Sequence, residues 1–166
     1  MRLFVAVRPP VEVLDALDAL PRPTATGVRW TTREQWHVTL RFFGDVDDPA
    51  PIGEALSNAL YGARAVDATI GPRAAMLGTR VIHLPVAGLD DVAASITSAT
   101  REFGDPPPQR RFHGHLTLAR TKGASVAIAE LALAHVWTVR AVELIRSHLH
   151  ADGARYEVLE RFALRD

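Results

Sequence analysis

The sequence predicts an α+β fold in a single domain, with antiparallel sheets and helices on the outer faces of those sheets. First, a length of 166 residues fits one domain. Second, a composition with 48% hydrophobic and 23% charged residues supplies enough apolar surface for a sizeable core. Third, the segments predicted as strands and helices mix without a strict β-α-β alternation, which disfavours a parallel sheet.

The first half of the chain predicts three strands and two helices. Residues 2–8 and 36–43 are largely apolar, with the β-branched and aromatic side chains typical of strands. Residues 28–31 predict a further short strand. In segments 11–20 and 50–60 the apolar residues instead recur at helical spacing, which predicts amphipathic helices.

The second half of the chain predicts alternating helices and strands that end in a long hairpin. Residues 137–164 are typical of two strands, and Asp152-Gly153 between them is typical of a tight hairpin turn. The proline-rich segment 105–111 predicts a loop. Around that loop we expect strands at 65–77 and 80–87, a helix at 89–103, a strand at 112–121 and a short Ala-rich helix at 126–134.

Charge and cysteine content narrow the function classes. With 19 basic and 19 acidic residues the net charge is zero, whereas proteins that hold long duplex nucleic acid carry a basic surplus. No cysteine is present, which excludes disulfides, cysteine nucleophiles and cysteine-based metal sites. No segment resembles a signal peptide or a membrane span, so we expect a cytoplasmic protein whose partner is a small ligand or the end of a nucleic acid.

A short motif occurs twice, in the two halves of the chain. His37-Val38-Thr39-Leu40 recurs as His115-Leu116-Thr117-Leu118, and both copies fall on predicted strands. A histidine in a strand is usually a partly buried residue satisfied by one hydrogen bond, so a single copy would be weak evidence of function. Two copies at matching places in two halves favour a functional origin.

The repeat has a chemical meaning because alternate residues of a strand share a face. His37 therefore projects with Thr39, and His115 with Thr117. If the two halves face each other, two imidazoles and two hydroxyls converge on one cleft. One imidazole can then deprotonate a water while the other protonates a leaving oxygen, and the hydroxyls can bind a phosphate held between them. This arrangement needs no metal and no covalent intermediate.

Strand parity also predicts the faces on which other polar residues near the motifs lie. Arg41 shares the face of His37, so it could reach the phosphate, although a solvated arginine at a strand end is equally consistent with the sequence. Arg120 has the opposite parity, which favours a structural role. His83 and His135 are isolated in the sequence, and we interpret both as structural.

Four segments together resemble a known family, the 2H phosphoesterases, and within it the RNA 2′,3′-cyclic phosphodiesterases, also called 2′-5′ RNA ligases. Segment 2–7 resembles the family's opening strand, and 147–164 its closing hairpin. WHVTLRFFG at 36–44 resembles its first motif, and HLTLAR at 115–120 its second.

The resemblance implies a bilobal, duplicated fold over residues 1–166, with two antiparallel sheets facing a central cleft and helices on their outer faces. It implies metal-independent opening of a 2′,3′-cyclic phosphate at an RNA 3′ end to leave a 2′-phosphate. In this reaction His37 would be the proton donor and His115 the proton acceptor, with Thr39 and Thr117 binding the substrate. We expect no metal and no cofactor. We expect a monomer that acts on RNA 3′ ends or nucleoside 2′,3′-cyclic phosphates and binds neither duplex nucleic acid nor membranes.

One departure from the family concerns the residues before the second motif. Many members carry Arg-Pro there, whereas this chain has His113-Gly114. His113 shares strand parity with His115. It could replace a cationic phosphate contact when protonated, or face solvent without a role.

Three alternatives to hydrolysis remain open at this level. The same two histidines could join RNA ends through a 2′-5′ bond, since each step is reversible in principle. The cleft could hold a nucleotide or phosphate without turnover, but binding alone does not need two titratable groups. A histidine-based zinc protein would need a third ligand at suitable spacing, and neither motif has one nearby.

Overall fold

The computed structural model describes residues 1–123 and 126–166. Ten strands, three α-helices and one 3₁₀ turn form within these residues. The strands are β1 (Arg2–Val7), β2 (Val28–Trp30), β3 (Val38–Asp45), β4 (Val66–Ile70), β5 (Ala75–Leu77), β6 (Val81–Ala87), β7 (His115–Thr121), β8 (His135–Val139), β9 (Ala141–His150) and β10 (Gly153–Ala163). The helices are α1 (Val11–Asp18), α2 (Ala50–Leu60) and α3 (Asp90–Ala99), and η1 (Arg33–Gln35) is the 3₁₀ turn.

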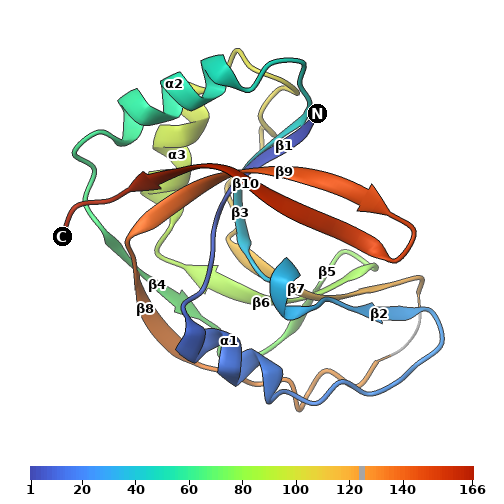
Figure 1. Cartoon of the computed structure of the whole chain (residues 1–166). Helices are drawn as coiled ribbons and strands as arrows, with labels where there is room; N and C mark the ends of the chain where they lie inside the picture. The colour runs from blue at the N-terminus through green and yellow to red at the C-terminus, as the bar shows by residue number, and fades with distance from the viewer. Residues whose placement is uncertain (124–125) are drawn as a thin grey trace.

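The named strands pair antiparallel along one curled path, in the order β10-β9-β1-β3-β7-β6-β4-β8 (Figure 1). We call β10, β9, β1 and β3 the first wing, and β7, β6, β4 and β8 the second wing. Off this path, β2 pairs with β7 and β5 with β6. The predicted α+β class with antiparallel pairing is confirmed.

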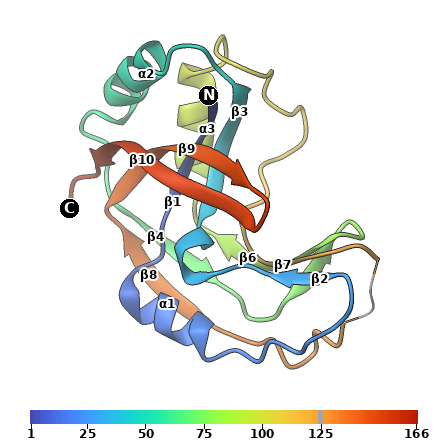
Figure 2. The same cartoon turned by 45° about the vertical axis from the view of Figure 1, so that its right-hand side comes forward.

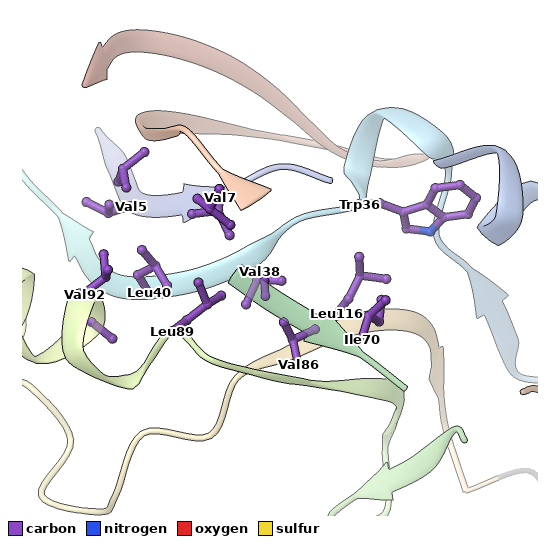
Figure 3. Close-up of a cluster of buried hydrophobic side chains, with 14 of the residues drawn as sticks. Val5, Val7, Trp36, Val38, Leu40, Ile70, Val86, Leu89, Val92 and Leu116 are labelled. Atoms are coloured by element: carbon purple, nitrogen blue, oxygen red, sulfur yellow. The ribbon is translucent and has the colours of Figure 1, made fainter. Parts of the chain in front are cut away.

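The two wings meet at a narrow joint. Between β3 and β7 the pairing register contains a single pair of residues, Val38 and Leu116. Both side chains are fully buried, and Figure 3 shows them among other core residues such as Val86 and Leu89. One contiguous cluster of buried apolar side chains includes residues of both wings. Val38 and Leu116, the second residue of each motif, therefore belong to the core that holds the wings together.

The helices cover the sheet from opposite ends of the molecule. Helices α2 and α3 pack against each other beside β3 and β10, whereas α1 lies at the other end near β8 (Figures 1 and 2). Each helix buries the apolar face that its spacing predicts, for example Ile52 and Leu56 in α2. The motif histidines lie on the other face of the sheet, opposite to the buried Val38 and Leu116.

Each central strand carries a β-bulge at the same place in its motif. Pairing of β1 with β3 skips Leu40, because Ala6 pairs with Thr39 and Val5 with Arg41. Pairing of β6 with β7 likewise skips Leu118. A bulge inserts one residue and reverses the faces of the residues beyond it. Strand parity counted from His37 or His115 therefore fails after the fourth motif residue.

Several predicted boundaries are wrong, for local reasons. Residues 126–134 form no helix, because Leu131 and Leu133, two positions apart, are both buried and the chain runs extended between them. The strand predicted over 65–77 is divided at Gly71-Pro72, where proline lacks an amide hydrogen for the ladder. The closing hairpin begins at β9, since β8 pairs with β4 instead.

Candidate active site

The two motifs meet at the joint between the wings. In an antiparallel pair, the residues on either side of Val38 and Leu116 project from the face opposite to theirs. His37, Thr39, His115 and Thr117 therefore share the face away from the core, and all four are partly exposed. The positive charge of a protonated His115 is among the influences that lower the pKa of His37, after burial. The structure thus brings together the four side chains that the repeat predicts.

Both histidines are oriented by the same local hydrogen bond. Nδ1 of His37 lies 2.7 Å from the carbonyl oxygen of Gln35, and Nδ1 of His115 lies 2.8 Å from that of His113. A carbonyl only accepts, so each Nδ1 carries the hydrogen. Each Nε2 is left as the nitrogen that gives or takes a proton. Nε2 of His37 lies 3.0 Å from the Thr39 hydroxyl, which donates to it when the ring is neutral.

An aromatic niche surrounds His37. The ring of Phe4 on β1 lies 4.8 Å from the His37 ring, and that of Tyr156 on β10 lies 5.1 Å away, edge to face. Burial lowers the pKa of His37 to about 4, against the opposing effect of its hydrogen bond to the Gln35 carbonyl. The closing hairpin thus supplies one wall of this niche, and His37 is neutral near neutral pH in the free protein.

Two further imidazoles surround His115. The ring of His83 lies 5.4 Å from that of His115, and the ring of His113 lies 6.0 Å from it in a stacked orientation. Burial lowers the pKa of His115. The hydrogen bond to the His113 carbonyl opposes this effect, and the charge of a protonated His113 ring adds to it. The interpretation of His83 as structural agrees with its burial, but the residue is not isolated in space, because β6 pairs it with Thr117 and places it beside the motif. His113 is exposed at the rim of this cluster.

The two bulges decide the positions of the arginines that follow the motifs. Arg41 turns into the protein, where it is 3% exposed and donates to the carbonyl oxygens of Phe42, Phe103 and Asp105. Neither role considered for Arg41 from the sequence is correct. It ties β3 to the loop that leads to the second motif.

Arg120 takes the opposite direction. It is exposed, and its charge is among the smaller influences that lower the pKa of both His37 and His115, after burial. The parity argument for a structural role of Arg120 is therefore wrong, since the bulge at Leu118 returns this side chain to the motif face.

Among residues 1–123 and 126–166, no group of three or more His, Cys, Asp or Glu side chains is arranged to hold a metal ion. Within these residues, too, no helix has the length and apolar character needed to cross a membrane.

Two known proteins are similar to this chain in sequence. An RNA 2′,3′-cyclic phosphodiesterase of Aeropyrum pernix is 35% identical over 112 residues, which cover 60% of this chain and 61% of the relative. An RNA 2′,3′-cyclic phosphodiesterase of Thermus thermophilus is 28% identical over 180 residues, covering 99% of this chain and 91% of the relative.

Solved structures share its fold. The crystal structure of TT0787 of Thermus thermophilus superposes with a TM-score of 0.84 at 31% identity, covering 99% of this chain and 98% of that one. Escherichia coli LigT complexed with 3′-AMP gives a TM-score of 0.80 at 27% identity, with the same coverage of 99% and 98%.

The family model of the 2′-5′ RNA ligase superfamily matches residues 8–151, a span that contains both motifs and the first strand of the closing hairpin, β9. The resemblance found in the sequence is confirmed, and the chain belongs to the 2′-5′ RNA ligase superfamily.

Proposed function

We propose that this protein is an RNA 2′,3′-cyclic phosphodiesterase, which opens a terminal 2′,3′-cyclic phosphate and leaves a 2′-phosphate without a metal. One observation carries the proposal. The single pair of residues that joins the wings is Val38 and Leu116, and in each motif the histidine and the threonine lie on either side of that residue. The names of the relatives agree with it, and the 3′-AMP in the LigT structure agrees with a nucleotide as ligand. The net charge of zero favours RNA ends and nucleotides over duplexes as substrates.

We further propose that residues 1–166 form one bilobal, duplicated domain and act as a monomer. Two features at matching motif positions support duplication. Each motif histidine bonds the carbonyl two residues before it, and each motif ends in a bulged leucine, Leu40 or Leu118. The two wings correspond to the two lobes, and the motif face between them corresponds to the cleft.

In the proposed reaction, the oxygen of a water attacks phosphorus while Nε2 of His115 accepts the water proton. The bond from phosphorus to the ribose 3′ oxygen breaks, and His37 gives its proton to that oxygen. Thr39 and Thr117 bind the non-bridging phosphate oxygens. The donor and acceptor assignment follows the family. On each ring a backbone carbonyl holds Nδ1, so Nε2 is the nitrogen that exchanges a proton, and in His37 it also accepts from the Thr39 hydroxyl.

The lowered pKa of His37 adds a requirement to this scheme. A proton donor must be protonated, yet burial favours the neutral ring in the free protein. A bound phosphodiester brings a negative charge next to the imidazole, which favours the protonated form. The substrate itself therefore raises the pKa of the group that must give up a proton.

The test of the function uses EDTA-treated protein and adenosine 2′,3′-cyclic phosphate. We expect turnover to persist after chelation, and the product to be adenosine 2′-phosphate, identified by ³¹P NMR and chromatography against the 3′ isomer. Activity that disappears with EDTA and returns with zinc or magnesium would contradict the metal-free reaction. A 3′-phosphate product would contradict the proposed leaving oxygen.

The pH dependence of kcat and of kcat/KM gives a second test. Because burial lowers both histidine pKa values, the alkaline decline of kcat/KM should begin below about pH 6.5, the ordinary histidine pKa. The decline of kcat should lie at higher pH, since kcat reports the complex in which the phosphate favours protonation. Profiles flat between about pH 5 and 9, or identical alkaline limbs, would contradict this expectation.

A further inference from the structure

A buried imidazole lies beside His115, on the neighbouring strand. His83 on β6 is 3% exposed and pairs with Thr117 on β7. Residues directly opposite each other in an antiparallel pair project from the same face of the sheet, so His83 shares the face of the second motif's His115 and Thr117. The ring of His83 lies 5.4 Å from that of His115, at an interplanar angle of 77°. The two imidazoles are therefore in edge-to-face contact.

One polar atom of His83 is left without a partner. Its Nδ1 is buried and makes no hydrogen bond with the described residues. Such an atom destabilises the folded protein, because it loses its hydrogen bonds to water on folding and gains none in return. An apolar side chain of similar shape would avoid that loss. Stability alone therefore does not account for an imidazole at this position.

The corresponding position in the first half of the chain carries no imidazole. Ala6 on β1 pairs with Thr39, as His83 pairs with the threonine of the second motif. Ala6 is fully buried, and the walls around the first motif histidine are two uncharged aromatic rings. The two motifs are alike, but their surroundings differ. The extra imidazole lies beside the histidine that we propose as the proton acceptor.

The charged and titratable side chains that act on this pair of rings are all bases. Burial lowers the pKa of His115 most, and the positive charges that lower it further belong to His113, Arg110 and Arg120. Burial also lowers the pKa of His83, and a proton on His115 or His113 lowers it further, against a hydrogen bond with the backbone of β5. His83 is therefore the imidazole that stays neutral while its neighbour takes up a proton.

We propose that His83 is a positioning residue for the proton acceptor, a neutral imidazole that packs against His115 and stabilises its protonated ring. The inference rests on the proposed function, in which His115 takes the proton of the attacking water. The imidazolium that results lies among other cations. A neutral imidazole has one nitrogen with a lone pair, and this nitrogen attracts a positive charge at close range. His83 itself neither gives nor takes a proton.

Two substitutions of nearly the same shape separate this role from packing. His83→Asn keeps a polar group near the position of Nδ1, whereas His83→Leu replaces it with an apolar one. We expect kcat for adenosine 2′,3′-cyclic phosphate to be about 10-fold lower in the Leu variant than in the Asn variant, with KM values within about threefold of each other. The Leu variant should have the higher melting temperature, because it buries no unpartnered polar atom. A merely structural role would instead make the more stable variant the more active one.

An NMR titration of the His115 ring provides a readout that packing does not produce. Because neutral His83 favours the protonated form of His115, the pKa of His115 should be lower by about 0.5 or more in His83→Leu than in His83→Asn. His113→Leu is the control with the opposite sign, since the loss of a like charge should raise the pKa of His115. The resonances of this ring are assigned by their absence in His115→Ala.

Three results would separate failure of this inference from failure of the proposed function. Equal kcat values in the two His83 variants, or the same His115 pKa in both, would overturn the role of His83. Wild-type protein that does not hydrolyse the cyclic phosphate would overturn the proposed function, while the NMR titration would still decide whether His83 stabilises a proton on His115. If His83→Leu does not fold, as judged by circular dichroism, His83→Phe takes its place in both measurements, because it keeps a ring without nitrogen atoms.

Discussion

His37→Ala and His115→Ala should each lower kcat by about 10²- to 10⁴-fold, the usual contribution of a general acid or base. Both rings lie on the face away from the core and are held through Nδ1, so the substitutions remove the proposed proton donor and acceptor without opening the core. The melting temperature should change little. The measurement is single-turnover and steady-state hydrolysis of a nucleoside 2′,3′-cyclic phosphate.

The double variant and a distant histidine provide the controls. Because the two imidazoles act in one step, the loss in His37→Ala/His115→Ala should be smaller than the product of the single losses. His148→Ala should retain full activity, since His148 pairs with Glu157 on the exposed side of the hairpin. Unfolding of the His37 and His115 variants, with normal activity in the folded fraction, would identify both as core residues instead.

Leu116→Ala should reduce the free energy of unfolding by about 2–5 kcal/mol, as large-to-small changes in a packed core do. Leu116 is fully buried and pairs with Val38, the one pair in the register of β3 and β7. The cavity left by the leucine side chain would lie at the joint between the wings. Urea denaturation followed by tryptophan fluorescence measures the change.

The next residue along β7 provides the contrast. Thr117→Ala lies on the opposite face, so its stability should stay within about 1 kcal/mol of the wild type, whereas its activity should fall. Comparable destabilisation by Thr117→Ala and Leu116→Ala would mean that the two faces of β7 are not divided between core and site. That outcome would remove the main support for the proposed function.

Local pattern was sufficient to predict which motif side chains share the face away from the core. Strand parity is a property of a few consecutive residues, so it correctly separates His37 and Thr39 from Val38, and His115 and Thr117 from Leu116. The same short-range logic predicts the amphipathic helices, because α1 and α2 bury the faces that their spacing indicates.

Features set by pairing between distant strands were not predictable in this way. The bulges at Leu40 and Leu118 arise from the register with β1 and β6, and they reverse the expected positions of Arg41 and Arg120. His83 reaches the site only because β6 lies next to β7. A single sequence carries no signal of these registers.

The position of Tyr156 beside His37 was also not predictable from the sequence. In the sequence it is one aromatic position of a predicted hairpin strand, and nothing local connects it with His37. The connection comes from the order of strands, which places β10 two strands away from β1, with the hairpin tip tied to η1 through Gln35. The sequence motif therefore locates the two histidines but not the side chains that surround them.

The single pair Val38 and Leu116 is the point about which the two wings could rotate relative to each other. Any rocking of one wing against the other about Val38 and Leu116 displaces a point in proportion to its distance from that pair. The four motif side chains neighbour this pair, so such a rocking would displace them least. A change in the angle between the wings about this pair would therefore leave the distance between His37 and His115 nearly constant.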